Sequence, residues 1–238
     1  MVNIVDEMTK RTLPRVLLTL IATLLLAFVI GYIGVSGFGG EPIGIEKASA
    51  YPGPYVEDIA ETAWQDSNRF WHSFFVDSGY ADRWGPANLY WVYDEPVNIP
   101  CGNEVLYPEQ GPVYCGMDWG IYYQVDFLAK EYGDGAVAAV VAHEMGHHVQ
   151  NLLGSHKRYT VQNELEADCF AGVYMASAYW DGMLDKGDVN EAYEMFGAMG
   201  DELDVYHDAH HGTSQERQEW FERGWNTEDP TQCGVALS

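Results

Sequence analysis

The chain has 238 residues, 47% of them hydrophobic, a length that suits one membrane anchor and a single domain with its own core. Its formal net charge of -24 at pH 7 would repel phosphate, which excludes a nucleic-acid partner. So acidic a surface favours solubility. With only five lysines it is also of the halophilic type, suited to concentrated salt that screens self-repulsion.

An unbroken apolar run occupies residues 16–35. Its twenty residues carry no charge, and a helix of that length crosses a bilayer. Three basic residues precede the run and two glutamates follow it soon after, and basic residues mark the cytoplasmic side. The sequence therefore predicts a single-pass membrane protein with a cytoplasmic tail over residues 1–15, a transmembrane signal anchor over 16–35 and an extracellular remainder.

A cleaved signal peptide is the alternative interpretation of this region. Ala48, Ser49 and Ala50 have the small-x-small form that signal peptidase accepts. They lie about 13 residues beyond the apolar run, farther than cleavage usually tolerates, and the run is longer than a typical signal-peptide core. The anchor is therefore preferred, and residues 36–55, rich in glycine and other small residues, are predicted to form a linker.

The segments after the linker predict one domain over residues 56–238. Apolar residues at helical spacing predict helices over residues 56–74 and 135–154, and further helices over 160–182 and 188–199. Aromatic-rich, β-prone stretches predict strands over 88–93 and 120–127. Four or five helices beside a small sheet make a mainly helical α+β domain.

The long helix predicted over residues 135–154 contains the pattern H-E-x-x-H, from His143 to His147. Residues four apart on a helix project to the same side, so both imidazoles can bind one metal ion. Glu144 lies on the adjacent face, where it can reach a metal-bound water without ligating the metal. His148 points elsewhere and is expected at the surface or behind the ligands.

A catalytic zinc needs a third protein ligand and one open position for water. Glu164 and Asp168 are four residues apart in the next predicted helix, so they face the same side. Glu164 is predicted to bind the zinc, and Asp168 to accept a hydrogen bond from the free ring N–H of a zinc-bound histidine. Glu166 is then the exposed member. The alternative is that all three acids form a solvated helix face.

These residues predict hydrolysis of a peptide or protein substrate at one Zn²⁺ per chain. Zinc lowers the pKa of its bound water toward neutrality, and Glu144 takes the proton as hydroxide attacks the peptide carbonyl. The developing oxyanion needs a further donor, for which His211 and Tyr206 are candidates. A second, adventitious metal site or plain surface histidines would explain the cluster at residues 207–211 equally well.

The four cysteines all lie on the predicted outward side, where disulfides are stable: Cys101, Cys115, Cys169 and Cys233. Their even number favours two bridges. Zinc ligation by cysteine is the alternative, but no C-x-x-C pair occurs. Three pairings are possible, and spacing does not choose among them.

Residues 98–233 resemble the neutral zinc metallopeptidases, a family of single-pass membrane proteins of bacteria and some archaea. The resemblance implies a zincin-like fold and a gluzincin-like site with His143, His147 and Glu164 as ligands, and it implies the bridges Cys101–Cys115 and Cys169–Cys233. It rests on blocks in the family's order: Cys101-Gly102, 111–115 (GPVYC), 141–154 (VAHEMGHHVQNLLG), 164–172 (ELEADCFAG), Gly187-Asp188, Gly200-Asp201 and 211–224 (HGTSQERQEWFERG).

The block that contains His211 and Arg217 is also similar to the H-x-x-x-x-x-R region of prenyl-protein endopeptidases, which makes His211 a candidate transition-state donor. Two positions depart from the family pattern. His210 stands where threonine is usual, a change expected to be harmless. Gln124 stands where aspartate is usual, which argues against a substrate or ion contact at that position.

Two other functions compete with the peptidase. A non-catalytic zinc-binding domain, for example in envelope assembly, requires a closed coordination sphere, and the sequence offers no fourth ligand. An acidic surface-interaction domain without metal would make H-E-x-x-H a chance occurrence. For the peptidase, an extended substrate is expected to pair with an open edge of the strand predicted at 120–127.

Overall fold

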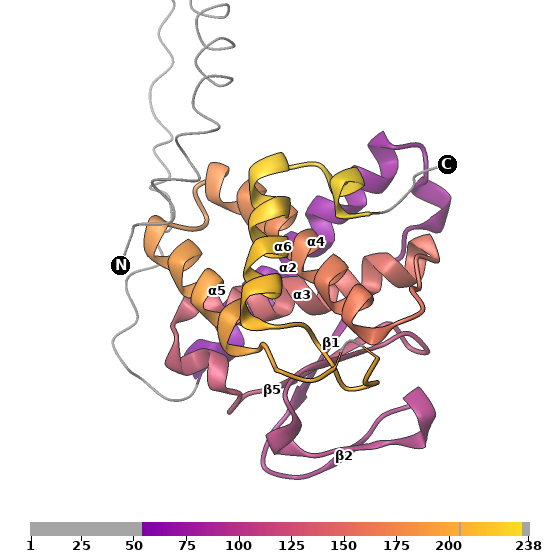
Figure 1. Ribbon diagram of the computed structural model, residues 1–238, viewed down its shortest axis with the longest axis vertical. Helices are drawn as coiled ribbons and strands as arrows, with labels where there is room; N and C mark the ends of the chain where they lie inside the picture. The colour runs from indigo at the N-terminus through magenta and orange to yellow at the C-terminus, as the bar shows by residue number, and fades with distance from the viewer. Residues whose placement is uncertain (1–53, 205, 235–238) are drawn as a thin grey trace, which may run out of the picture.

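The computed structural model describes residues 54–204 and 206–234. In this part of the chain, helices are gathered on one side and short strands on the other (Figure 1). The α+β prediction is confirmed for it. The helices are α2 (Pro54–Asp77), α3 (Asp134–Leu153), α4 (Thr160–Trp180), α5 (Lys186–Ala198) and α6 (Ser214–Thr227), and the strands are β1 (Asn88–Val92), β2 (Val97–Asn98), β3 (Val105–Leu106), β4 (Val113–Cys115) and β5 (Gly120–Gln124).

Helices α2 to α5 occur where apolar periodicity predicts them, with ends that differ by a few residues. Helix α6 was not predicted. Its start carries a local signal that the prediction missed, because Thr213 and Glu216 form a capping box. The Glu216 N–H donates to Oγ1 of Thr213 at 3.2 Å, and the Thr213 N–H donates to Oε2 of Glu216 at 2.9 Å.

Strand β5 is the centre of the main sheet, which has the order β1-β5-β4. It pairs in parallel with β1 and antiparallel with β4, and all five of its residues are buried. The predicted strand 120–127 ends at Gln124, because the N–H of Phe127 turns back to the carbonyl of Gln124 at 3.0 Å. Since both edges of β5 are paired, the expectation that a substrate docks on this strand is wrong.

The sheet lies between two layers. On one face Tyr123 packs into the core formed with α2 and α3. On the other face Tyr122 packs against Ile99 and Leu106 of the segment that contains the antiparallel β2–β3 pair. The Cys101–Cys115 disulfide, with Cα atoms 5.6 Å apart, ties this segment to β4. That face of the sheet is thereby covered, and β1 and β4 are its outer strands.

Helices α4 and α6 approach closely because each has a glycine at the contact. A Cβ atom on Gly172 would collide with the backbone carbonyl of Phe221, and one on Gly224 with that of Cys169. The Cys169–Cys233 disulfide links α4 to the segment after α6. Both pairings implied by the family resemblance are confirmed.

The predicted tail, the membrane anchor at 16–35 and residues 36–53 of the predicted linker lie outside the described residues. Helix α2 begins at Pro54, so the last two positions of the predicted linker are helical. Across residues 54–204 and 206–234, no helix combines the length and apolarity needed to span a bilayer.

Candidate metal centre

The metal-binding pattern lies on α3, a helix with an unusually apolar interior. Its residues from Ala136 to Gly146 are all buried. His143 and Glu144 are each only 5% exposed, and polar groups so deep in a core are costly unless they have partners. The helix ends at Gly154, whose positive φ of 68° allows its N–H to bond to carbonyls of the last turn. The chain then turns back into α4, which brings Glu164 opposite the two histidines.

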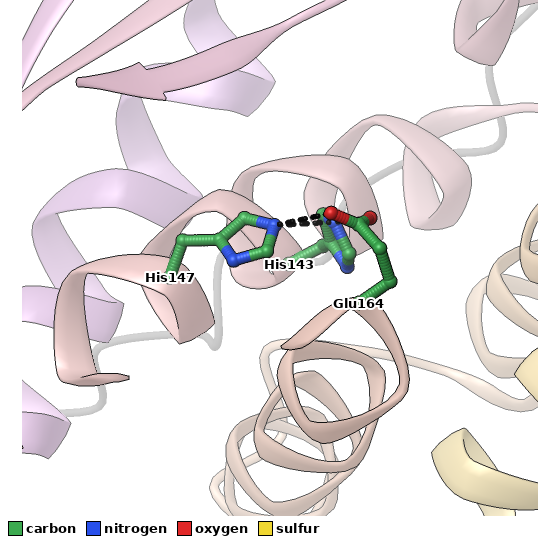
Figure 2. A group of neighbouring side chains, drawn as sticks. All are labelled: His143, His147 and Glu164. Carbon is green, nitrogen blue, oxygen red and sulfur yellow. Dashed lines mark hydrogen bonds and ion pairs between the residues drawn. The ribbon is translucent and has the colours of Figure 1, made fainter. Parts of the chain in front are cut away.

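The three predicted ligands converge in space (Figure 2). The Nε2 atoms of His143 and His147 lie 3.1 Å apart. Glu164 places Oε2 at 3.3 Å from His143 Nε2 and Oε1 at 3.4 Å from His147 Nε2. Tetrahedral zinc with bonds of about 2.0–2.1 Å holds its ligand atoms about 3.3 Å apart. The spacing and the donor types of this group therefore fit a zinc ion.

His143 is oriented by Asp168, as the sequence predicts for one of the histidines. Its Nδ1 lies 2.7 Å from Oδ1 of Asp168, which is completely buried. Arg217 on α6 donates to both oxygens of that carboxylate, at 2.9 and 2.7 Å. The acceptor on Nδ1 leaves Nε2 of His143 as the nitrogen that faces Glu164.

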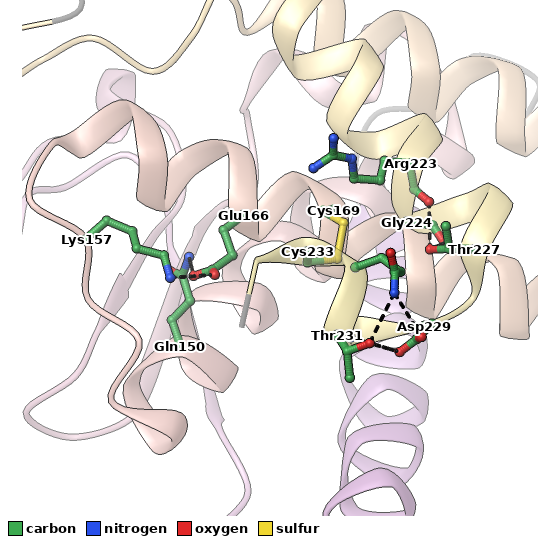
Figure 3. The surroundings of a disulfide bond; sticks show 11 residues. Gln150, Lys157, Glu166, Cys169, Arg223, Gly224, Thr227, Asp229, Thr231 and Cys233 are labelled. Atoms are coloured by element: carbon green, nitrogen blue, oxygen red, sulfur yellow. Dashed lines mark hydrogen bonds and ion pairs between the residues drawn. A yellow bond between two sulfur atoms is a disulfide. The ribbon is translucent and has the colours of Figure 1, made fainter. Parts of the chain in front are cut away.

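His147 is held by a different partner, which sequence reasoning missed. Its Nδ1 lies 2.9 Å from Oε1 of Gln150, one turn further along α3. Gln150 in turn donates to Oε2 of Glu166 at 3.0 Å, and Lys157 places Nζ at 3.0 Å from the other oxygen of Glu166 (Figure 3). Glu166 was predicted to be exposed, but it is 1% exposed. The prediction was wrong because the loop between α3 and α4 folds over it.

The pKa values reflect how tightly these groups are coupled. Burial opposes the charged form of His143, but its bonds with Asp168 and Glu164 outweigh this effect and raise its pKa to about 10. Burial raises the pKa of Glu164, but the two imidazoles outweigh this effect and hold that pKa well below the usual range. A cluster that keeps protons on ligand nitrogens in this way releases them when a metal binds.

Glu144 lies beside this group without belonging to it. Burial raises the pKa of Glu144, and the neighbouring His143 and His147 partly offset that shift. The backbone of Tyr114, in β4, also favours the charged form of the carboxylate and so lowers its pKa slightly. Glu144 and Tyr114 line the same cleft, between α3 and β4.

His148 is completely buried. The prediction that it lies at the surface or behind the ligands is therefore wrong for the surface. Its Nε2 lies 2.7 Å from the carbonyl of Gly85, and its Nδ1 lies 2.9 Å from the hydroxyl of Tyr114. Asn151 donates to the same hydroxyl at 3.2 Å. Burial lowers the pKa of His148 to about 4. The neutral ring thus ties β4 to α3.

A cleft of about 650 Å³ opens above the three predicted ligands. Residues 110–114 and Gly116 line one side of it, and Met199 and His211 also contribute. His211 is held by Asp201, whose Oδ2 accepts its backbone N–H at 2.8 Å. Tyr206, the other candidate oxyanion donor, is 70% exposed and is not among the described residues that line the cleft.

The two departures from the family pattern have different surroundings. His210 is buried, and its Nδ1 lies 2.6 Å from Oδ1 of Asp201, so it steadies the loop that carries His211. Gln124 is 1% exposed and does not line the cleft. Its amide has no hydrogen-bond partner within the described part of the chain.

A second acidic group lies away from the cleft, where α3 begins and α5 passes. Carboxylate oxygens of Asp134, Asp188 and Glu191 lie within 4.8 Å of one another. Burial raises the pKa of Asp188 to about 6 and that of Glu191 to about 7, and repulsion from the neighbouring acids adds to both shifts. The sequence did not predict this group, because it joins two helices that are far apart in the chain.

Two helix-borne histidines and a glutamate that could hold a metal ion, beside a buried glutamate in a cleft, define a zinc-peptidase type of site. The chain belongs to the family described as "Putative neutral zinc metallopeptidase", which it matches over residues 46–235. The family resemblance inferred from the sequence is thereby confirmed.

The curated relatives extend over most of the chain. It is 30% identical over 257 aligned residues to "Uncharacterized protein YpfJ" of Escherichia coli (strain K12), with 89% of this chain and 84% of that protein covered. It is 36% identical over 178 residues to "Uncharacterized protein Rv2575" of Mycobacterium tuberculosis (strain H37Rv), with 60% of each covered. No solved structure matches the chain. The comparisons support a peptidase at the level of the family.

Proposed function

We propose that this protein is a zinc metalloendopeptidase in which His143, His147 and Glu164 bind one Zn²⁺ and Glu144 is the general base. The observation that carries the proposal is the convergence of three side chains at a cleft: the two histidine Nε2 atoms lie 3.1 Å apart, and each lies 3.3 or 3.4 Å from one oxygen of Glu164. The three ligands come from two helices and leave the side toward the cleft open. A closed structural site would need a fourth protein ligand.

A zinc ion held by His143, His147 and Glu164 would supply Lewis acidity for the peptide carbonyl and would lower the pKa of the attacking water. Glu144 accepts the proton of that water and later delivers it to the leaving amine. His211 lines the cleft and its side chain is 49% exposed, so its ring can turn toward a developing oxyanion.

The proposed substrate is an extended segment of a peptide or protein. With β5 paired on both sides, the outer strands β1 and β4 each keep a free edge, and of the two only β4 lines the cleft, through Val113 and Tyr114. An extended peptide can add to such an edge by backbone hydrogen bonds. This arrangement would lay the scissile bond along the cleft beside Glu144.

The proposed location follows from the sequence and from the disulfides. The apolar run at residues 16–35 is proposed to anchor the chain, with the domain on the outer side of the membrane. The two disulfides support an oxidising environment. A C-terminal epitope that added protease digests in intact cells would support this orientation, and one that resists digestion until the membrane is opened would contradict it.

The decisive experiment compares the full-length chain with Glu144→Gln. Zinc content by elemental analysis is expected to stay at one per chain, and cleavage of denatured casein to fall by roughly 10²- to 10⁴-fold, the usual contribution of a general base. Glu219→Gln, an exposed position on α6, is the matched control and should retain full activity.

The other outcomes separate the rival functions. Equal activity in Glu144→Gln would refute the assigned base. Stoichiometric zinc without cleavage of casein or of a peptide library by the wild-type chain would favour a non-catalytic zinc-binding domain. Absence of zinc from the purified protein would overturn both.

A further inference from the structure

The metal-facing position of His147 depends on a side chain to which the proposed reaction assigns no part. Gln150 is 2% exposed, and its amide has three partners. Oε1 lies 2.9 Å from Nδ1 of His147. Nε2 donates to the backbone carbonyl of Asn163 at 2.7 Å and to Oε2 of Glu166 at 3.0 Å.

The partners of Gln150 determine which way its amide points. The carbonyl of Asn163 and the carboxylate of Glu166 only accept hydrogen bonds, so they must face the NH₂ group. Turning the amide over would bring its oxygen against two acceptors, and both hydrogen bonds that Nε2 now donates would be lost. Oε1 is therefore the atom presented to His147.

The orientation of the amide in turn determines the tautomer of His147. Because Oε1 of Gln150 can only accept, Nδ1 of His147 must carry the proton. In the neutral ring that binds a metal, Nε2 then bears the lone pair, on the side that faces Glu164 at 3.4 Å. A metal ligand needs exactly that state of the ring, and a neighbouring acceptor also strengthens the ligand.

The carboxylate of Glu166 is itself held by residues of the loop between α3 and α4. Ser155 donates to its Oε2 at 2.9 Å, and Lys157 places its ammonium at 3.0 Å from Oε1. The nearby cation offsets the cost of burying the carboxylate. Glu166 lies two residues after Glu164 on α4, so the same helix turn supplies a proposed ligand and the group that orients Gln150.

We propose that Gln150 and Glu166 are positioning residues: Glu166 orients the Gln150 amide, which holds His147 in the tautomer and direction that metal binding requires. This inference rests on the proposed zinc site. It assigns to His147 a neutral orienting acceptor, in contrast to the carboxylate of Asp168 on His143. Glu166 thereby acts on the ligand His147 through two successive hydrogen bonds, one to Gln150 and one from Gln150 to His147.

The experiment measures zinc affinity of the full-length chain by competition with a chromophoric chelator, together with thermal unfolding of the zinc-free chain. Gln150→Met keeps the length of the side chain and removes its polar atoms, and the dissociation constant is expected to rise roughly 10- to 100-fold. Glu166→Gln lets the Gln150 amide turn over, so a smaller rise is expected. Gln162→Met, at an exposed position on α4, is the control and should bind zinc as tightly as wild type.

A spectroscopic measurement separates positioning from a general loss of structure. Cobalt(II) in place of zinc has visible absorption bands that depend on ligand geometry, and Gln150→Met is expected to shift them. A variant with a lower melting temperature but unchanged zinc affinity and unchanged bands would overturn the inference. If Gln150→Met does not fold, Glu166→Gln carries the test alone, and wild-type affinity in that variant would overturn the role of Glu166.

Failure of this inference differs from failure of the proposed function. A wild-type chain that binds zinc, with Gln150→Met matching the control, refutes the positioning role and leaves the metal site intact. A wild-type chain that binds no zinc refutes the site, and the positioning role with it.

Discussion

Arg217 and Asp168 form a buried two-pronged ion pair, with Nε 2.9 Å from Oδ2 and Nη2 2.7 Å from Oδ1. Arg217 is 3% exposed and Asp168 is fully buried. The same Oδ1 lies 2.7 Å from Nδ1 of His143. Helix α6 has no proposed metal ligand, yet through this pair it supports the centre on α3 and α4.

Replacing Arg217 by methionine should be strongly destabilising, because the Asp168 carboxylate would remain buried without its counter-charge. Breaking one side of a buried ion pair costs about 3–5 kcal/mol. The free energy of unfolding of the zinc-free chain, measured in urea, should fall by that amount. Lys130→Met, which breaks a pair with the exposed Asp126, should change it by less than about 1 kcal/mol. Equal effects in the two variants would contradict the structure of the pair.

The proposed ligands could be predicted from the sequence because their arrangement is local. His143 and His147 are one helical turn apart, and so are Glu164 and Asp168, so helical geometry alone brings each pair to one side. The groups behind them could not be found in this way. Arg217 reaches Asp168 from a helix 49 positions later in the chain, and no periodicity in the sequence reports that contact.

Burial was predicted less well than secondary structure for the same reason. By its position on the predicted helix, Glu166 was expected to face solvent. The loop that contains Ser155 and Lys157 covers it, and helical periodicity does not predict where that loop folds. The position of β5 in the centre of its sheet depends on β4, a three-residue strand too short to give a sequence pattern. Helices α2 to α5 were predictable because each carries several turns of apolar periodicity.

The acidic group at the start of α3 should make stability depend on pH. Burial raises the pKa of Asp188 from 3.8 to about 6 and that of Glu191 from 4.5 to about 7. Asp134 and Asp185 also face these groups and favour their protonated forms. Between these values the folded chain binds more protons than the unfolded chain, so the free energy of unfolding contributed here falls as pH rises.

Glu191→Gln removes one of the titrating groups and keeps an oxygen that can accept the Gly135 N–H, which Glu191 now binds at 3.0 Å. The variant is expected to be more stable than wild type at pH 8, by about 1 kcal/mol once solvent screening is allowed for, and no more stable at pH 4. Urea unfolding at both pH values measures the difference. Glu194→Gln, exposed on the same helix, should differ from wild type equally at both pH values. The same result for Glu191→Gln would rule out the raised pKa.

Two buried glutamines allow a matched test of how hydrogen bonding decides the effect of a polar side chain in the core. Gln150 uses both ends of its amide, toward His147 and toward Glu166. Gln124 is equally buried, but its amide atoms find no partner among the described residues. A buried polar group without a partner is destabilising relative to an apolar group of the same shape, whereas removing a bonded one leaves its partners unsatisfied.

Methionine matches glutamine in length, so the same substitution should have opposite effects at the two positions. Gln124→Met is expected to raise the free energy of unfolding by about 1 kcal/mol, and Gln150→Met to lower it by about 2–3 kcal/mol. Urea unfolding of the zinc-free chain measures both without any contribution from the metal. A loss of stability in Gln124→Met would mean that this amide is satisfied in the folded protein, and that the departure from aspartate at this position preserved a polar contact.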